Sequence, residues 1–267
     1  MLRAMVSDTS FDPLSATILE GEYVWAQYAP HPSLAAWVST YWTLRTEGPA
    51  VIRTLADACI DLTISLGPTP RAFVAAVETH ATIRRSPGSM HLVSARLLPG
   101  AAGLLDISAD SLGEGWTRLE TILPEPLVST LVQAMTEAAD DRACVAVFDA
   151  FFSERLLNRS LDPRLGVALR EIFARRGDVT IAALARASGA HTRTLCRLFE
   201  HAVGVSPKRF ARIVRLQATL RDLPEDASWT TAAHRLGYYD QAHFIREVRE
   251  LFGTTPGELA KLRRHTS

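Results

Sequence analysis

A glycine at residue 189 separates two stretches of helical periodicity at a spacing that few folds satisfy. Ala185 precedes Gly189 by four residues, and Leu195 follows the glycine six residues later. An alanine allows two helices to cross closely, and a glycine adopts the left-handed conformation that ends the first helix. A large apolar residue then anchors the second helix in the core. The spacing predicts a helix-turn-helix, whose second helix enters the major groove of DNA.

The same spacing recurs 48 residues further along the chain. Ala233 precedes Gly237 by four residues, and Phe244 follows seven residues later. One match carries little weight because Ala-x-x-x-Gly is common, but two matches in one basic segment favour a domain with two such units. Between them, residues 206–220 begin with Ser-Pro and predict a helix. A helix of that length spans roughly 22 Å and, with the bodies of the units, can set the two second helices about one DNA turn apart.

The second helix of each unit carries polar side chains opposite its apolar stripe when residues are placed at about 100° intervals. In the first unit these are Arg193 and Arg197, and in the second Arg246 is one of them, with Gln241 in the exposed first turn of the helix. Arginine pairs in bidentate fashion with guanine, and glutamine with adenine. We therefore expect these four side chains to contact bases. The alternative is that they belong to the solvated faces of amphipathic helices.

The formal net charge of zero hides an uneven distribution of charge. Residues 1–158 contain 10 Arg and Lys against 18 Asp and Glu, whereas residues 159–267 contain 19 against 11. A chain with an acidic half and a basic half usually has a different partner for each. The basic half has the electrostatic character of a phosphate binder. Chance segregation, or docking of one half on the other, is the alternative.

The first half of the chain is predicted to be β-rich. Short segments of β-branched, aromatic and aliphatic residues alternate with Gly, Pro, Asp and Ser, as in a β-sandwich or barrel. Brief helices are expected over residues 33–38 and after Gly100. The predicted strands are 23–28, 39–44, 51–55, 60–66, 71–77 and 90–98.

The spacing of apolar residues along the sequence changes after residue 124. Apolar residues at helical spacing predict two helices within 126–157, broken near Asp140, that bridge two domains or form a dimer interface. An Asp-Pro pair at residues 162–163 predicts the start of another helix. We therefore divide the chain into a β-rich sensing or dimerisation domain (1–123), a helical linker or dimerisation segment (124–158) and a double helix-turn-helix domain (159–267).

Two segments resemble the DNA-binding domain of the AraC/XylS family of bacterial transcription regulators. They are residues 199–210 (FEHAVGVSPKRF) and residues 236–256 (LGYYDQAHFIREVRELFGTTP). The resemblance covers about the last hundred residues. It implies a seven-helix domain with two units joined by a long helix, and base contacts at Arg193, Arg197, Gln241 and Arg246. His-Thr at 191–192, Cys196 and Leu259 depart from the usual pattern and leave the target DNA sequence open.

The first domain more faintly resembles the N-terminal domain of a subset of these regulators. The resemblance lies in Tyr-Ala-Pro at 28–30, Tyr-Trp at 41–42, LADACIDL at 55–62 and LLPG at 97–100, with Ala58 in place of the usual glycine. It implies a cupin-like domain that senses a ligand or dimerises.

Asp57, Cys59 and Asp61 alternate and would share one face of a strand. Together with His80 or His91 they could ligate a metal, but a loop-to-strand transition with a buried cysteine is the expected reading, so no metal site and no catalytic residue are predicted.

Other residues leave alternatives open. Cys196 lies beside the proposed DNA face, where its oxidation would break binding, although no resolving cysteine is near in sequence. Trp25, Trp42 and Trp116 can line a ligand pocket, with core packing the expected role for each.

The sequence therefore predicts a regulator that binds double-stranded promoter DNA, without a cofactor and without enzymatic activity. We expect a homodimer that contacts RNA polymerase and responds to an apolar or amphipathic small molecule bound within residues 20–123. Residues 1–10 lack a secretory pattern and no apolar run approaches about 18 residues, so a cytoplasmic location is expected. The alternatives are a cupin-like metal-dependent protein or enzyme with a fused DNA-binding domain, and a non-specific architectural binder.

Overall fold

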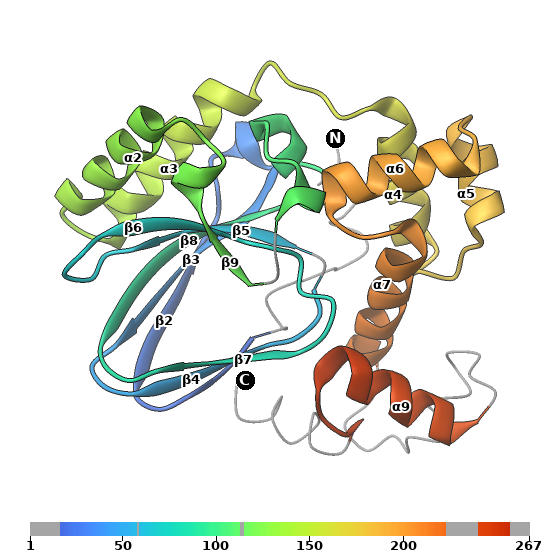
Figure 1. Ribbon diagram of the computed structural model, residues 1–267, viewed down its shortest axis with the longest axis horizontal. Coiled ribbons are helices and arrows are strands. Elements are labelled where there is room, and N and C mark those ends of the chain that lie inside the picture. Colours follow the sequence, from blue (N-terminus) through green and yellow to red (C-terminus); the bar gives the residue numbers. More distant parts are fainter. Residues whose placement is uncertain (1–16, 58, 113–114, 223–239, 257–267) are drawn as a thin grey trace.

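The chain consists of a β-rich N-terminal part followed by a helical C-terminal part (Figure 1). The computed structural model describes residues 17–57, 59–112, 115–222 and 240–256. The observed architecture confirms the fold class predicted from the sequence.

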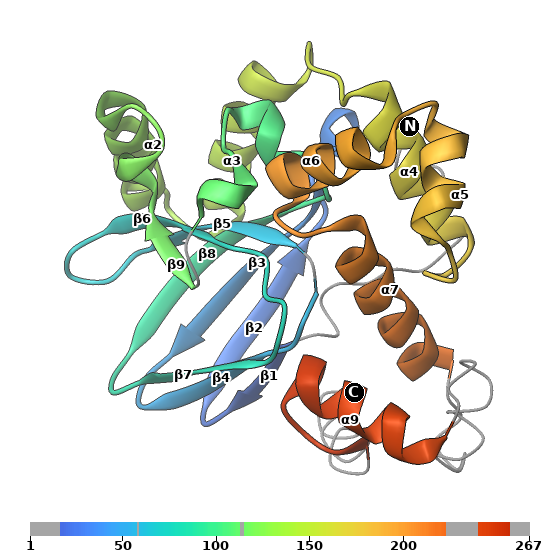
Figure 2. The ribbon, with the colours of Figure 1, turned by 45° about the vertical axis from the view of Figure 1, so that its right-hand side comes forward.

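Two antiparallel sheets face each other in the N-terminal part (Figure 2). The larger sheet has the strand order β2-β3-β8-β5-β6-β9, and the smaller has the order β1-β4-β7. The strands are β1 Thr17–Glu20, β2 Tyr23–Tyr28, β3 Val38–Thr46, β4 Ala50–Thr54, β5 Ile60–Ser65, β6 Arg71–Ala75, β7 Thr82–Ser86, β8 Met90–Leu97 and β9 Trp116–Arg118.

The six predicted strands are all present, with small differences at their ends, but β1, β7 and β9 were not predicted. Strand β7 carries two arginines in five residues, and only its pairing with β4 makes it a strand. The helix expected over 33–38 is wrong in extent. It is a single 3-10 turn, η2 (Pro32–Leu34), because Val38 already begins β3. The other short turns are η3 Ala102–Leu105, η4 Ala109–Ser111 and η5 Leu119–Thr121.

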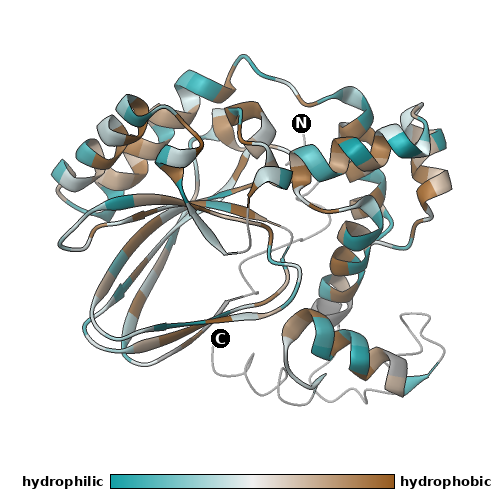
Figure 3. Cartoon of the chain, in the orientation of Figure 1, coloured by the Kyte–Doolittle hydropathy of each residue, from teal (hydrophilic) through white to brown (hydrophobic). Residues whose placement is uncertain are grey.

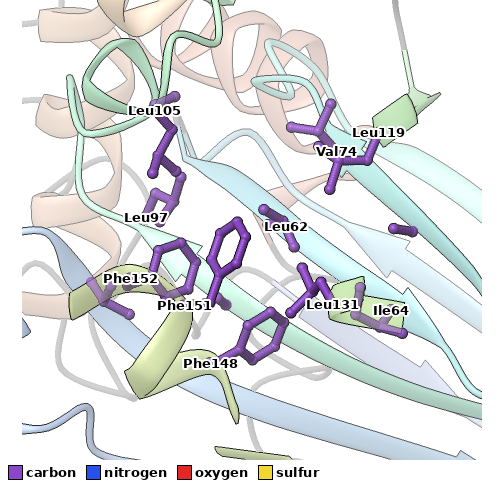
Figure 4. Packing of buried hydrophobic residues seen from close by; sticks show 14 of the residues in the cluster. Leu62, Ile64, Val74, Leu97, Leu105, Leu119, Leu131, Phe148, Phe151 and Phe152 are labelled. Atoms are coloured by element: carbon purple, nitrogen blue, oxygen red, sulfur yellow. The ribbon is translucent and has the colours of Figure 1, made fainter. Parts of the chain in front are cut away.

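Helices α2 (Glu125–Glu137) and α3 (Asp141–Leu156) cover the outer face of the larger sheet (Figures 1 and 4). Their apolar residues share one core with the strands. Tyr41 of β3 stacks on Phe148 of α3 with 5.5 Å between ring centroids, and its hydroxyl donates a hydrogen bond to Asp149 at 2.8 Å. The two helices are thus packed against the sheet, and a bridging or dimerising role for them stays a prediction.

The interior between the two sheets is built differently from this core. Its buried apolar cluster contains Trp42, Leu44 and Leu92, with Trp25 and Trp116 packed against it. Other inward positions of β5 and β8 carry the polar side chains of Asp61, Thr63 and Arg96, so this space is only partly filled by apolar groups.

The C-terminal part is helical throughout its described residues. Asp162 caps α4 by accepting a hydrogen bond from the backbone N–H of Arg164 at 2.9 Å, as predicted. Figure 3 shows apolar and polar residues alternating along α6, α7 and α9, as expected for amphipathic helices. The helices are α4 Pro163–Ala174, α5 Ile181–Ser188, α6 Thr192–Val203, α7 Pro207–Asp222 and α9 Gln241–Phe252.

None of the helices in the described ranges is both long and apolar enough to cross a membrane.

Candidate nucleic-acid interface

The first predicted helix-turn-helix consists of α5, a tight turn and α6. Gly189 ends α5 in the left-handed conformation, with φ of 64°, and the N–H of Ala190 donates to the carbonyl of Ala185 at 3.0 Å. Leu195 and Phe199 of α6 are fully buried in the helical core. The glycine and the leucine of the sequence pattern therefore have the roles predicted for them, and Ala185 is buried in the same core.

The second predicted unit is represented by its second helix, α9. Phe244, Val248 and Leu251 form its buried stripe. Ala233 and Gly237 lie outside the described residues, so the turn predicted there is not described.

All four predicted base-contacting side chains lie on the exposed faces of their helices. Arg193 and Arg197 lie on α6, and Gln241 and Arg246 lie on α9. None of the three arginines forms an ion pair within the described part of the chain, so these guanidinium groups have no carboxylate to compete with a nucleic acid. Figure 1 shows α6 and α9 at opposite ends of α7.

A buried ion pair fixes α9 on α7, and sequence reasoning missed it. Glu247 lies in the apolar stripe of α9 with only 2% of its surface exposed, and Arg212 of α7 donates to its carboxylate. The same arginine donates to Glu250 at 2.7 and 3.0 Å and lowers the pKa of that carboxyl. The signal in the sequence was a glutamate at a position where the helical spacing calls for an apolar residue.

The N-terminal part contacts both ends of this helical assembly. Near α6, Ser108 and His201 are hydrogen-bonded at 2.8 Å between Oγ and Nδ1. Near α9, Leu55 and Ala56 are buried in the same apolar core as the helices. The segment between β4 and β5 therefore belongs structurally to the helical domain as well as to the sheets.

A cavity of about 40 Å³ lies between the two sheets. Trp25, Trp42 and Trp116 all line it, so the pocket-lining alternative describes these residues better than core packing alone. Its polar lining includes three carboxylates, two guanidinium groups and one thiol, from Asp57, Asp61, Glu78, Arg84, Arg96 and Cys59.

The charged residues in the cavity form two groups, of which the one around Arg96 is buried and the one around Arg84 is partly buried. Arg96 donates to both oxygens of Asp61, from Nε at 2.8 Å and from Nη2 at 2.7 Å, and lies 3.1 Å from Asp57 Oδ2. Arg84 pairs with Glu78 at 2.5 Å. Burial raises the pKa of Asp57 to about 7, with Arg96 opposing that shift. The role of Arg96 could not be read from the sequence, because only the register of β5 and β8 places this arginine opposite Asp61.

The metal-site alternative brought Asp57, Cys59 and Asp61 together with a histidine. The structure places the first three around the cavity, but His80 is exposed and His91 contacts Asp141 of α3 at 3.2 Å. Among the described residues, no group of three or more His, Cys, Asp and Glu side chains is arranged to hold a metal ion. Cys196 is half-buried on α6, and its redox role stays a prediction.

Two segments of the chain match known domain families. Residues 184–262 match a family described as a helix-turn-helix domain, and residues 26–114 match a domain of unknown function (DUF6597).

Three curated relatives are regulators by name. The "Probable thc operon regulatory protein" of Rhodococcus erythropolis is 32% identical over 99 residues, 36% of this chain and 30% of that protein. The HTH-type transcriptional activator RhaS of Pectobacterium carotovorum is 37% identical over 68 residues, 25% of this chain and 24% of that protein. The transcriptional activator NphR of a Rhodococcus species is 35% identical over 81 residues, 30% and 24% of the two chains. The matches thus span less than a third of each relative.

Among solved structures, ToxT from Vibrio cholerae aligns over 91% of this chain and 99% of its own, with 10% identity and a TM-score of 0.42. A likeness at that level does not establish a shared fold. The family match and the geometry of α5, Gly189 and α6 are the stronger findings, and they agree. Residues 184–262 are therefore a helix-turn-helix domain.

Proposed function

We propose that the protein is a sequence-specific DNA-binding transcription regulator whose N-terminal domain binds a small molecule. The observation that carries the proposal is the pair of exposed polar faces on α6 and α9, at opposite ends of one rigid helix, within a helix-turn-helix domain. The names of the relatives support the same function.

The four exposed side chains are suited to reading bases rather than to general attraction. Arg193 and Arg197 are one helical turn apart on α6, so they can reach neighbouring base pairs in one groove. Gln241 begins α9, and Arg246 is exposed on the side of the helix opposite its buried stripe. The N-terminal residues of a recognition helix are those that contact base edges, and Gln241 has that position.

An enzyme with a fused DNA-binding domain is the competing function. It would need a converging set of histidines and carboxylates in the β-rich domain. The carboxylates of Asp57 and Asp61 instead face Arg96, and His91 lies against α3. These contacts favour ion pairing of the two carboxylates over metal binding. We therefore propose a regulator without enzymatic activity.

The assembly and partners of the regulator belong to the same proposal. We propose a cytoplasmic homodimer that contacts RNA polymerase at a promoter, as the family resemblance implies. A dimer binds two copies of its DNA site, arranged symmetrically or as a repeat, whereas a monomer binds one copy. The arrangement of sites in the bound DNA therefore distinguishes the two states.

Selection of bound sequences from random DNA duplexes tests the function. The expected result is a motif with two segments about one helical turn apart, one for each reading helix. Recovery of unselected sequence, with equal affinity for random DNA, would instead support the architectural binder.

A further inference from the structure

The cavity between the sheets has an imbalance of charge. Arg84 is engaged by Glu78, and Arg96 holds both oxygens of Asp61. Asp57 has the longer arginine contact, 3.1 Å, and shares that guanidinium group with Asp61. Three carboxylates therefore face two guanidinium groups in a site where all but Arg84 are buried, so an unpaired charge there is costly.

The tryptophans that line the cavity supply aromatic faces and a hydrogen-bond donor, in addition to the charged groups. Trp25 and Trp42 are stacked with 4.9 Å between ring centroids, and the Arg84 guanidinium already lies 5.3 Å from the Trp116 ring centroid. Trp42 is 93% buried, since 7% of it is exposed, yet its Nε1 donor has no hydrogen-bond partner within the described structure. An indole N–H is a donor only, so a bound acceptor would satisfy it.

We propose that this cavity binds a small organic cation that also carries a hydrogen-bond acceptor, and that the segment Leu55–Asp57 transmits its binding to α7 and α9. The inference rests on the proposed function and names the ligand class and the route of regulation. Aromatic faces beside a carboxylate are the surroundings that organic cations prefer. An anion would have to displace Asp57 or Asp61 from Arg96 and would leave that carboxylate unpaired.

A single residue, Ala56, separates the cavity-lining Asp57 from the contacts with α7 and α9. Asp57 faces the cavity, while both backbone groups of its neighbour Ala56 bond to the DNA-binding domain. The N–H of Ala56 donates to the carbonyl of Leu251 in α9 at 3.2 Å, and its carbonyl accepts from Gln217 Nε2 of α7 at 2.6 Å. A shift of Asp57 toward a ligand therefore pulls on the contact between the long helix and the second reading helix.

The raised pKa of Asp57 fits this role. A carboxyl that titrates near pH 7 exists in both forms at neutral pH, and a bound cation favours the ionised form. The ligand can act on DNA binding only if it prefers one arrangement of the helices over another.

The test measures binding of defined probes to the full-length protein by calorimetry at pH 8. The probes are propylammonium and 2-methoxyethylammonium, their neutral counterparts propanol and 2-methoxyethanol, and the anions butyrate and methoxyacetate. The ammonium ions are expected to bind, the methoxy one more tightly, and the alcohols and anions are not. Asp57→Asn should weaken ammonium binding by about tenfold or more, the range for a charged hydrogen bond. Glu47→Gln, an exposed acid of the same domain, is the matched control.

Two further variants separate the parts of the proposal. Trp42→Phe keeps an aromatic face but removes the Nε1 donor, so it should abolish the preference for the methoxy probe. Gln217→Leu should leave ammonium binding in place while removing its effect on affinity for the selected DNA.

Absence of ammonium binding, tighter binding of the anions, or full binding by Asp57→Asn would overturn the ligand class. A probe effect on DNA affinity that survives Gln217→Leu would overturn the route. Failure of DNA selection would overturn the proposed function and leave the probe result intact.

Discussion

The side chain of Gln217 in α7 and the backbone of Ala56 are joined by a hydrogen bond of 2.6 Å across 161 positions of the sequence. Ala56 is fully buried, and it lies in the core of the helical domain although it belongs to the connection between β4 and β5. The two domains are therefore connected by a buried polar contact as well as by apolar packing. This contact ties the orientation of the helical domain to the β-rich domain.

Replacing Gln217 with leucine tests the strength of that connection. The change leaves the Ala56 carbonyl buried without its partner, which should lower the free energy of unfolding by about 1–3 kcal/mol. Chemical denaturation followed by circular dichroism measures the loss. Gln133→Leu, an exposed glutamine on α2, should change stability by less than about 0.5 kcal/mol, and equal losses for the two variants would contradict a role for the contact.

Alanine at Arg193, Arg197 or Arg246 should change sequence preference more than affinity. Loss of a bidentate base contact costs about 1–3 kcal/mol of discrimination at one or two base pairs. Binding of each variant to the selected duplex, to single-base variants of it and to random DNA separates the two effects. Arg175→Ala, an exposed arginine at the end of α4, is the charge-matched control. A uniform loss on all sequences would mark the arginine as a phosphate contact.

Residues 160–267 alone should fold as a helical protein and bind DNA. The structure adds that this fragment lacks Leu55 and Ala56, which are part of its core, so it should unfold at a lower temperature than the same domain in the full chain. Circular dichroism and DNA binding at low salt measure both expectations. A soluble, helical fragment without affinity for DNA would contradict the proposed function.

The pKa of Asp57 predicts a pH dependence of stability. Burial raises it to about 7 in the folded protein from the ordinary value of 3.8. Between these values the folded state holds a proton that the unfolded state has lost, so the contribution of Asp57 to stability should fall as pH rises from about 4 to about 7. Denaturation of the wild type and Asp57→Asn across this range should show that the stability of the wild type falls relative to that of the variant. An identical slope in both proteins would mean that Asp57 is ionised throughout.

Phe148→Ala tests the attachment of α3 to the larger sheet. Phe148 is fully buried against Tyr41 and Phe152, so its truncation should cost about 3–5 kcal/mol. Leu157→Ala, at an exposed apolar residue just after α3, serves as the control with little expected loss. A small loss for Phe148→Ala would favour a helical segment that is held elsewhere, for example in a dimer.

Local sequence chemistry was sufficient to predict the first helix-turn-helix unit. A glycine at the end of α5, a buried leucine three residues into α6 and a Ser-Pro start of the long helix each act over one or two helical turns. The exposed sides of α6 and α9 follow from helical periodicity alone, so Arg193 and Arg246 could be placed without a structure. Strands β2, β3, β4, β5, β6 and β8 followed from alternation and turn residues in the same way.

Only the tertiary structure determined which distant segments pair and which of their residues face each other. Strand β7 is a strand because β4 pairs with it, and Arg96 is buried because the register of β5 and β8 brings it opposite Asp61. The contact between Ala56 and Gln217 joins residues from different domains. Local patterns record which face of an element is apolar, but pairing between distant segments depends on loop closure and packing over the whole chain.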